Sequence, residues 1–111
     1  MYKMPKECMG FEISPRESAG VFKHRFVTQE FSVDDDQYSI SIIYDVDQIG
    51  HAYPWDNPED IGNGVVVELA TLKNGEYFED TDSEWRVITS DLELGNFLHE
   101  WINDLNDCLN S

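Results

Sequence analysis

The sequence predicts an α+β fold, in which an antiparallel β-meander of about four to five strands carries a C-terminal amphipathic helix packed on one face. Three observations predict it. Apolar and polar residues alternate from Tyr38 to Val46, Asn74-Gly75 is a strong hairpin signal, and apolar residues recur at three-and-four spacing near the C-terminus. The 111 residues suit a single domain, 1–111, and the 13% of aromatic residues suits a packed core rather than a disordered chain.

The first half of the chain predicts one hairpin after an irregular start. Residues 1–20 are punctuated by Pro and Gly, and only Cys8 to Ile13 favours a short strand. Val21 to Val33 predicts a strand with a bulge where its alternation slips, and residues 34–37 predict the turn into the strand Tyr38 to Val46. In that strand the even-numbered residues form the apolar face, so the serines at 39 and 41 are expected on the outer face.

The second half predicts three more strands. Asp47 to Gly64 is a long connection, and loops of this length inside compact domains are usually functional or mobile. Strands are expected at Val65 to Leu72, Glu76 to Glu79 and Trp85 to Thr89, with an acidic turn from Asp80 to Glu84 before the last of them.

The C-terminal helix has both a start signal and an apolar face. Ser90 and Glu93 form a capping box, S-x-x-E, at its beginning. Because an apolar face must be covered, the helix is expected to lie on the sheet. The residues expected on that face are Leu94, Phe97, Leu98, Trp101, Ile102, Leu105, Cys108 and Leu109.

The two cysteines, Cys8 and Cys108, lie near opposite ends of the chain. One disulfide is compatible with this count, but two buried thiols in a reducing compartment are favoured. No window has the length and apolar character of a membrane helix, and the first six residues lack the apolar stretch of a secretory signal. A cytoplasmic location is therefore expected.

No catalytic or metal-binding motif is complete. His99 begins an H-E-x-x-H pattern, but Asn103 stands where the second histidine is needed. Asp80 to Glu84 begins like a calcium loop, yet Trp85 and Asp91 occupy the positions that require Gly and Glu. No nucleophile elbow, phosphate-binding loop or dinucleotide motif is present. The sequence predicts neither an enzyme nor a metal site nor a cofactor.

Charge is the outlying property of the chain. Seven basic and 23 acidic residues give a net charge of −16. Residues 1–25 carry five basic and three acidic residues, whereas residues 26–111 carry only two basic residues, Lys73 and Arg86, and twenty acidic ones. Solubility requires a net charge of only about 2 to 8, and self-repulsion destabilises a compact domain. An acidic proteome or a halophilic source is one explanation, and a surface that binds a basic partner is the other.

The predicted helix favours the binding explanation. Its outward residues include Glu93, Glu100, Asp104 and Asp107, and it contains no Lys or Arg. A helix dipole favours cations in the last turn by about 0.3–1 kcal/mol each, so this composition forgoes stability. A solvated face of drifted composition is the alternative.

The long connection places aromatic residues beside acidic ones. Tyr53 and Trp55 are followed by Asp56, Glu59 and Asp60. Tyr and Trp are enriched among the residues that dominate binding energy at interfaces, which favours a binding role. In the alternative interpretation, Tyr53 and Trp55 fold back and cap the core.

The expected partner is a basic protein, because a charge of −16 repels both phosphate and the anionic membrane surface. A DNA mimic would have to reproduce phosphate spacing. Glu93 to Asp107 spans about 21 Å as a helix, over which duplex DNA carries roughly 12 charges, and the outward helix face supplies only four acids. The acidic turns near residues 34 and 80 would have to align with the helix. An inhibitor that only complements one positive cleft requires fewer acidic residues and no regular spacing between them. The sequence therefore favours a protein inhibitor.

Several short motifs resemble the C-terminal half of SMI1/KNR4-type bacterial immunity proteins. They are Gly62–Gly64, the strands Val65 to Leu72 and Glu76 to Phe78, and the helical segment Phe97–Trp101. That family tends to run from a Gly-Asn-Gly segment through a β-meander to a closing helix with a Phe-Leu pair. The resemblance covers under half of the chain, and the N-terminal half does not match. It implies an immunity protein bound to a toxin, often a nuclease, and it transfers no functional residue.

The sequence therefore predicts an acidic inhibitor or immunity protein that neutralises a basic partner, with a toxic nuclease as the favoured target, by charge complementarity. The alternative is a phage-type DNA mimic that inhibits a CRISPR, restriction or other DNA-binding protein. The predicted partner-binding residues lie in the acidic turns, the long connection and the outward helix face. They are Asp34, Asp35, Asp36, Tyr53, Trp55, Asp56, Glu59, Asp60, Asp80, Asp82, Glu84, Glu93, Glu100, Asp104 and Asp107.

Overall fold

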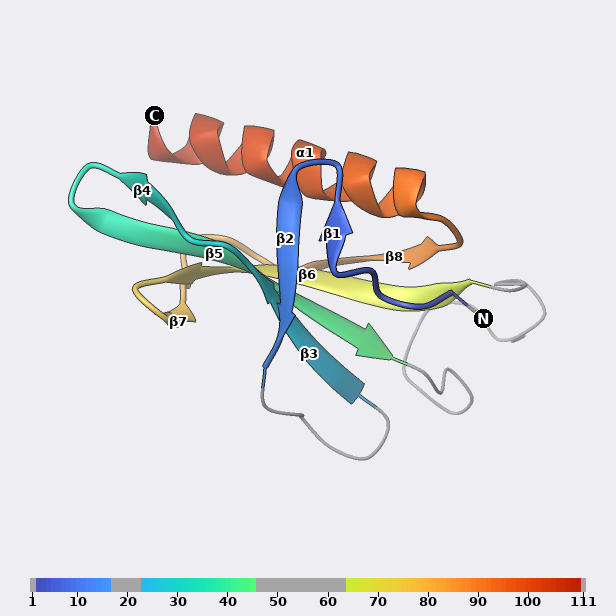
Figure 1. The fold of residues 1–111 in the computed structure, drawn as a ribbon. Coiled ribbons are helices and arrows are strands. Elements are labelled where there is room, and N and C mark those ends of the chain that lie inside the picture. The colour runs from blue at the N-terminus through green and yellow to red at the C-terminus, as the bar shows by residue number, and fades with distance from the viewer. Residues whose placement is uncertain (1, 17–22, 46–63, 111) are drawn as a thin grey trace.

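The computed structural model describes residues 2–16, 23–45 and 64–110. Within them, one antiparallel sheet of eight strands has one long helix packed on one face (Figure 1), which confirms the α+β fold class and the C-terminal helix. The helix α1 spans Asp91–Leu109. The strands are β1 Glu7–Cys8, β2 Phe11–Pro15, β3 Lys23–Thr28, β4 Phe31–Val33, β5 Asp36–Asp45, β6 Val65–Lys73, β7 Glu76–Tyr77 and β8 Glu84–Ile88.

The sheet is centred on the long pair β5–β6. Its order is β1-β2-β3-β5-β6-β7, with β4 also beside β5 and β8 also beside β6. It has more strands than the four to five predicted, because two segments that were each expected to form one strand are divided in two. Met9 and Gly10 both have positive φ, and they fold the segment around the short strand expected over Cys8 to Ile13 into the hairpin β1–β2. The single strand expected over residues 21–33 is divided into β3 and β4.

The division between β3 and β4 is the bulge that the sequence predicts. Between β3 and β4, the three residues 28–30 lie opposite only two residues of β5, 39 and 40. An extra residue in one strand leaves a backbone group of its neighbour without a ladder partner. Here the hydroxyl of Thr28 accepts the backbone N–H of Ile40 at 2.9 Å and replaces that partner.

The predicted hairpin turns are confirmed, with shifted ends. Asn74 and Gly75 join β6 to β7 and both have positive φ, as a type I′ turn requires. The acidic turn predicted over residues 34–37 joins β4 to β5. It is limited to Asp34 and Asp35, because β5 already begins at Asp36. β7 ends two residues earlier than predicted, and β8 begins one residue earlier.

The start of α1 follows the predicted capping box. Ser90 is the N-cap, and its hydroxyl accepts the backbone N–H of Glu93 at 3.3 Å. The Glu93 carboxylate in turn accepts the backbone N–H of Thr89 at 3.4 Å and the hydroxyl of the same residue. These bonds satisfy donors that a helix start otherwise leaves unpaired. In the described part of the chain, no helix has the length and apolar character that crossing a membrane requires.

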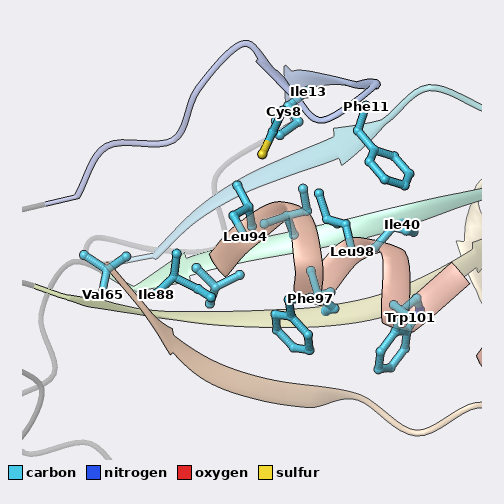
Figure 2. Packing of buried hydrophobic residues seen from close by; sticks show 13 residues of the cluster. Cys8, Phe11, Ile13, Ile40, Val65, Ile88, Leu94, Phe97, Leu98 and Trp101 are labelled. Atoms are coloured by element: carbon cyan, nitrogen blue, oxygen red, sulfur yellow. The ribbon is translucent and has the colours of Figure 1, made fainter. Parts of the chain in front are cut away.

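The core lies between α1 and the covered face of the sheet (Figure 2). Leu94, Phe97 and Leu98 of the helix are at most 1% exposed, and Ile40 and Ile42 of β5 are fully buried. Burying one such side chain contributes about 1.5–3 kcal/mol. The cluster comprises Cys8, Phe11, Ile13, Ile40, Ile42, Val65, Val67, Leu69, Ile88, Leu94, Phe97, Leu98 and Trp101.

The β1–β2 hairpin adds to this core and fixes the first turns of α1. Cys8 Sγ donates to the carbonyl of Asp91 at 3.1 Å, and Tyr2 donates its hydroxyl to Asp91 Oδ1 at 2.7 Å. His99 Nε2 lies 3.0 Å from the Met9 carbonyl, which holds the hairpin turn against the helix. The N-terminal segment is therefore an ordered part of the helix packing.

The two cysteines do not form the pair of buried thiols that the sequence favoured. Cys8 is buried, whereas Cys108 is exposed near the far end of α1, and they form no disulfide. About 25 Å of helix separates Asp91, which contacts Cys8, from Cys108, and a disulfide requires Cα atoms within about 7 Å. Burial, and secondly the charge of Asp91, raise the pKa of the Cys8 thiol, so this cysteine is an inert core residue.

The face of the sheet opposite the helix is more buried than predicted. Ser39 and Ser41 are 5% and 0% exposed, and Leu72 and Val66 on the same face are also buried. Arg16 reaches over this face, where its Nη1 donates to Ser41 Oγ at 3.2 Å. Over residues 38–43, the part of this alternation whose burial is described, the pattern separated the two faces correctly. It could not show that larger neighbours on adjacent strands bury the small serine side chains.

A matched pair of substitutions on α1 tests the packing. Leu98 is 0% exposed and Leu92 is 64% exposed. We expect Leu98→Ala to lower the free energy of unfolding by about 2–5 kcal/mol, because it leaves a cavity under the helix. Leu92→Ala should change it by less than about 0.5 kcal/mol. Urea denaturation followed by far-ultraviolet circular dichroism measures both, and equal effects would contradict the packing described.

Candidate functional site

The predicted acidic segments gather at one end of an elongated molecule. The principal extents are 44 × 25 × 25 Å. Figure 1 shows the β4–β5 turn, β7 and the C-terminus of α1 at the same end of the long axis. We name this region the acidic end and define it by the acidic residues of these segments and of the stretch from β7 into β8. They are Asp34, Asp35, Asp36, Glu76, Glu79, Asp80, Asp82, Glu84, Asp104 and Asp107.

Hydrogen bonds around Asn74 fix two turns of the acidic end to each other. Asn74 Nδ2 donates to Asp36 Oδ1 at 3.0 Å, and its Oδ1 accepts the backbone N–H of Gln37 at 2.9 Å. Lys73 Nζ lies 3.6 Å from the other carboxylate oxygen of Asp36. Asp36 therefore stabilises the turns, while the two turn residues before it are exposed.

Arg86, the second basic residue beyond residue 25, is also engaged by an acid. Its Nη1 lies 2.6 Å from Glu100 Oε2, and its guanidinium carbon lies 4.4 Å from the centre of the Phe97 ring. The pair is 45% and 55% exposed, so it stabilises the fold little, as exposed ion pairs usually do. Its consequence is electrostatic, because Glu100 offers less net charge to a partner than its outward position suggested.

Glu93 has a structural role instead of a place in the acidic end. Its carboxylate is hydrogen-bonded within the cap of α1. Figure 1 shows the start of α1 at the end of the helix remote from the acidic end. The structure therefore does not bring Glu93 together with the other predicted partner-binding residues.

The C-terminal half of α1 carries acids that no described basic residue compensates. The last turn of α1 contains no basic residue. Asp107 is exposed in that turn, and Asp104 is exposed one turn before it. The helix ends with Asn110 donating its N–H to the carbonyl of Asn106 at 3.0 Å. Carboxylates next to the negative end of a helix dipole cost stability. The acidic end therefore includes two carboxylates, those of Asp104 and Asp107, whose position near the end of the helix is unfavourable.

Three predicted residues line one pocket. A cavity of about 220 Å³ lies between the C-terminal half of α1, β6 and the stretch into β8. Asp82, Glu84 and Asp104 supply its carboxylates. Its remaining described walls are Thr71, Thr81, Trp101 and Leu105. The sequence marked the three acids individually, but their convergence depends on the register of β8 against β6 and on the position of α1.

The aromatic residues of the predicted site lie outside the described residues, together with their acidic neighbours. These are Tyr53, Trp55, Asp56, Glu59 and Asp60. Two other large aromatic residues, Tyr77 and Trp85, are 50% and 37% exposed. They lie on strands directly beside Glu76 and Glu84. Sequence reasoning assigned both to strands but gave no reason to expect them at the surface, because aromatic residues in strands are usually buried.

The described part of the chain contains no group of side chains arranged to bind a metal ion. Among those residues, no three His, Cys, Asp or Glu side chains are placed to hold one metal ion. The calcium-like segment 80–84 instead enters β8 at Glu84. Three carboxylates of the acidic end, those of Asp82, Glu84 and Asp104, line the pocket, and the others lie on the surface around it.

Comparison with protein-family models, with curated proteins and with solved structures gave no match. The resemblance to SMI1/KNR4-type immunity proteins therefore stays a prediction from short sequence motifs. The site is interpreted from its own geometry.

Neutralising one acid at each end of α1 tests the cost of the helix charges. Asp107→Asn should raise the free energy of unfolding by about 0.3–1 kcal/mol at low salt, because it removes an unfavourable charge–dipole interaction. Asp91→Asn should lower it, because Asp91 lies in the favourable first turn and accepts the Tyr2 hydroxyl.

Chemical denaturation at low salt and in 1 M salt measures both effects. The electrostatic part should shrink in 1 M salt, where the screening length is about 3 Å. A loss of stability with Asp107→Asn would show that this carboxylate contributes to the fold.

Proposed function

We propose that the protein is an acidic inhibitor, of the immunity-protein kind, that binds and neutralises a basic partner through its acidic end. The favoured partner is a toxic nuclease. The observation that carries the proposal is the coincidence of ten acidic residues at one end with a helix terminus that gives up stability to keep its charges. A fold shaped by stability alone would place cations in that last turn.

The size of the acidic end suits a cleft. A cross-section of 25 × 25 Å corresponds to on the order of 600 Å², comparable with the roughly 800 Å² that each partner buries in a standard interface. A nuclease binds phosphates with a positive cleft. An end that is narrow and negative can enter such a cleft and exclude the nucleic acid. The exposed Tyr77 supplies an aromatic contact beside the charges.

Charge complementarity also increases the rate of association between the two proteins. Opposite potentials raise association rate constants toward roughly 10⁸–10⁹ M⁻¹s⁻¹, and fast capture protects a cell from a lethal enzyme. The short motifs that resemble SMI1/KNR4-type proteins agree with this role, and the encounter is proposed to take place in the cytoplasm.

Capture from a host lysate, followed by an activity assay, tests the proposal. The immobilised protein should retain a basic protein at low salt and release it at high salt. One equivalent of the protein should then inhibit the nuclease activity of the released partner. Capture of a DNA-binding protein that has no nuclease activity would favour the DNA-mimic alternative, and no basic protein at low salt would overturn both.

Matched charge variants locate the contact. Asp34→Asn/Asp35→Asn removes two exposed acids from the acidic end, and Glu7→Gln/Glu12→Gln removes two exposed acids from β1 and β2. At about 0.2–1 kcal/mol for each exposed charge, the first variant should weaken binding by roughly two- to thirtyfold. The second should leave the affinity nearly unchanged. Equal losses would show a nonspecific charge effect.

A further inference from the structure

The pocket of the acidic end has a fixed, largely apolar floor beneath its carboxylates. Trp101 and Leu105 line it and are only 7% and 2% exposed. Trp101 donates its indole N–H to Thr71 Oγ1 at 3.0 Å, and Thr71 itself is 1% exposed. This buried bond holds the indole in one orientation. The floor is therefore arranged before any ligand arrives, which lowers the entropy lost on binding.

The carboxylates around the floor have no cation supplied by the described residues. Asp82 and Glu84 come from the stretch into β8, and Asp104 comes from the helix above. Among the described basic residues, Lys73 pairs with Asp36 and Arg86 pairs with Glu100, and none pairs with these three acids. The pocket thus combines concentrated negative charge with an aromatic wall, and the described residues supply no counter-charge to it.

The geometry favours an extended organic cation over a metal ion. A divalent ion needs several oxygens within about 2.0–2.6 Å of one point, and these three acids belong to no such group among the residues described. A guanidinium group spreads its charge over a plane with five N–H donors, bonds to carboxylates and stacks on aromatic rings. Its aliphatic stem packs on apolar surface while its head remains with polar groups.

The volume agrees with one side chain. A cavity of about 220 Å³ holds on the order of seven water volumes of about 30 Å³ each. That is room for a guanidinium and part of its stem.

We propose that this pocket receives one arginine side chain of the basic partner and so provides specificity beyond general charge attraction. This inference rests on the proposed function for its partner, but the pocket can be tested without that partner. Arginine is the residue expected because lysine presents a compact ammonium, which matches separated carboxylates and an aromatic wall less well.

The direct test uses N-acetyl-arginine amide as the probe, with N-acetyl-citrulline amide as its neutral isostere and N-acetyl-lysine amide as the second cation. The readout is the indole N–H signal of Trp101 in a ¹H–¹⁵N correlation spectrum. We expect the arginine probe to shift that signal with a dissociation constant on the order of millimolar, typical of one or two weak contacts. The lysine probe should bind more weakly, and citrulline should not bind. An equal response to citrulline, or no response to arginine, would overturn the inference.

A matched pair of triple variants shows where the probe binds. Asp82→Asn/Glu84→Gln/Asp104→Asn neutralises the pocket, and Asp34→Asn/Asp35→Asn/Asp107→Asn removes the same charge elsewhere on the acidic end. All six residues are exposed, so both variants should fold. We expect the pocket variant to lose the arginine response and the control to keep it. Equal weakening in both variants would reduce the effect to bulk charge and overturn the pocket.

The two proposals fail separately. If a basic partner is captured but the pocket variant binds it as well as the control does, the pocket inference is wrong and the proposed function stands. If the arginine probe binds but no basic partner is retained, the pocket stands as a cation site and the proposed function is wrong. A shift of the Trp101 signal by Ca²⁺ at lower concentration than by arginine would assign the pocket to a metal and overturn the inference.

Discussion

Leu94, Phe97, Leu98 and Trp101 of α1 pack against β5 and β6, and this contact holds together a chain whose charges mostly repel one another. With a net charge of −16, electrostatics opposes compaction. Burial of the helix face must therefore outweigh both chain entropy and repulsion. Because folding rests on that one face, the outward face of α1 is free to carry unfavourable acids. The same packing positions Trp101 as the floor of the acidic pocket, so core and site share a residue.

Features that depend on a few neighbouring residues could be predicted from the sequence. Features that depend on how distant strands pair could not. The cap at Ser90, the Asn74-Gly75 turn and the bulge before residue 31 follow from side-chain chemistry within a few residues, and each is confirmed. The β1–β2 hairpin was missed because Met9 occupies a positive-φ position without a turn signature. The acids at 82, 84 and 104 were predicted singly, yet their shared pocket depends on how β8 pairs with β6 under α1.

The structure also divides the predicted acids by the groups they contact. Asp36 is held by Asn74 and Lys73. Glu93 is held in the helix cap, and Glu100 is held by Arg86. The exposed acids at the turns and at the end of α1 have a different setting, since no described basic residue pairs with them. The proposed inhibitor would combine long-range attraction with a local pocket. Such an inhibitor would need no phosphate-like spacing, which a strict DNA mimic would require.

The central claim is that a basic partner docks on the acidic end. Amide hydrogen exchange of the free protein and of its complex with the captured partner tests it most directly. Protection should increase in residues 34–36, 76–84 and 100–109, while exchange in β1 and β2 should be unchanged. Protection confined to β1 and β2, or to the sheet face around Ser39 and Ser41, would contradict the claim.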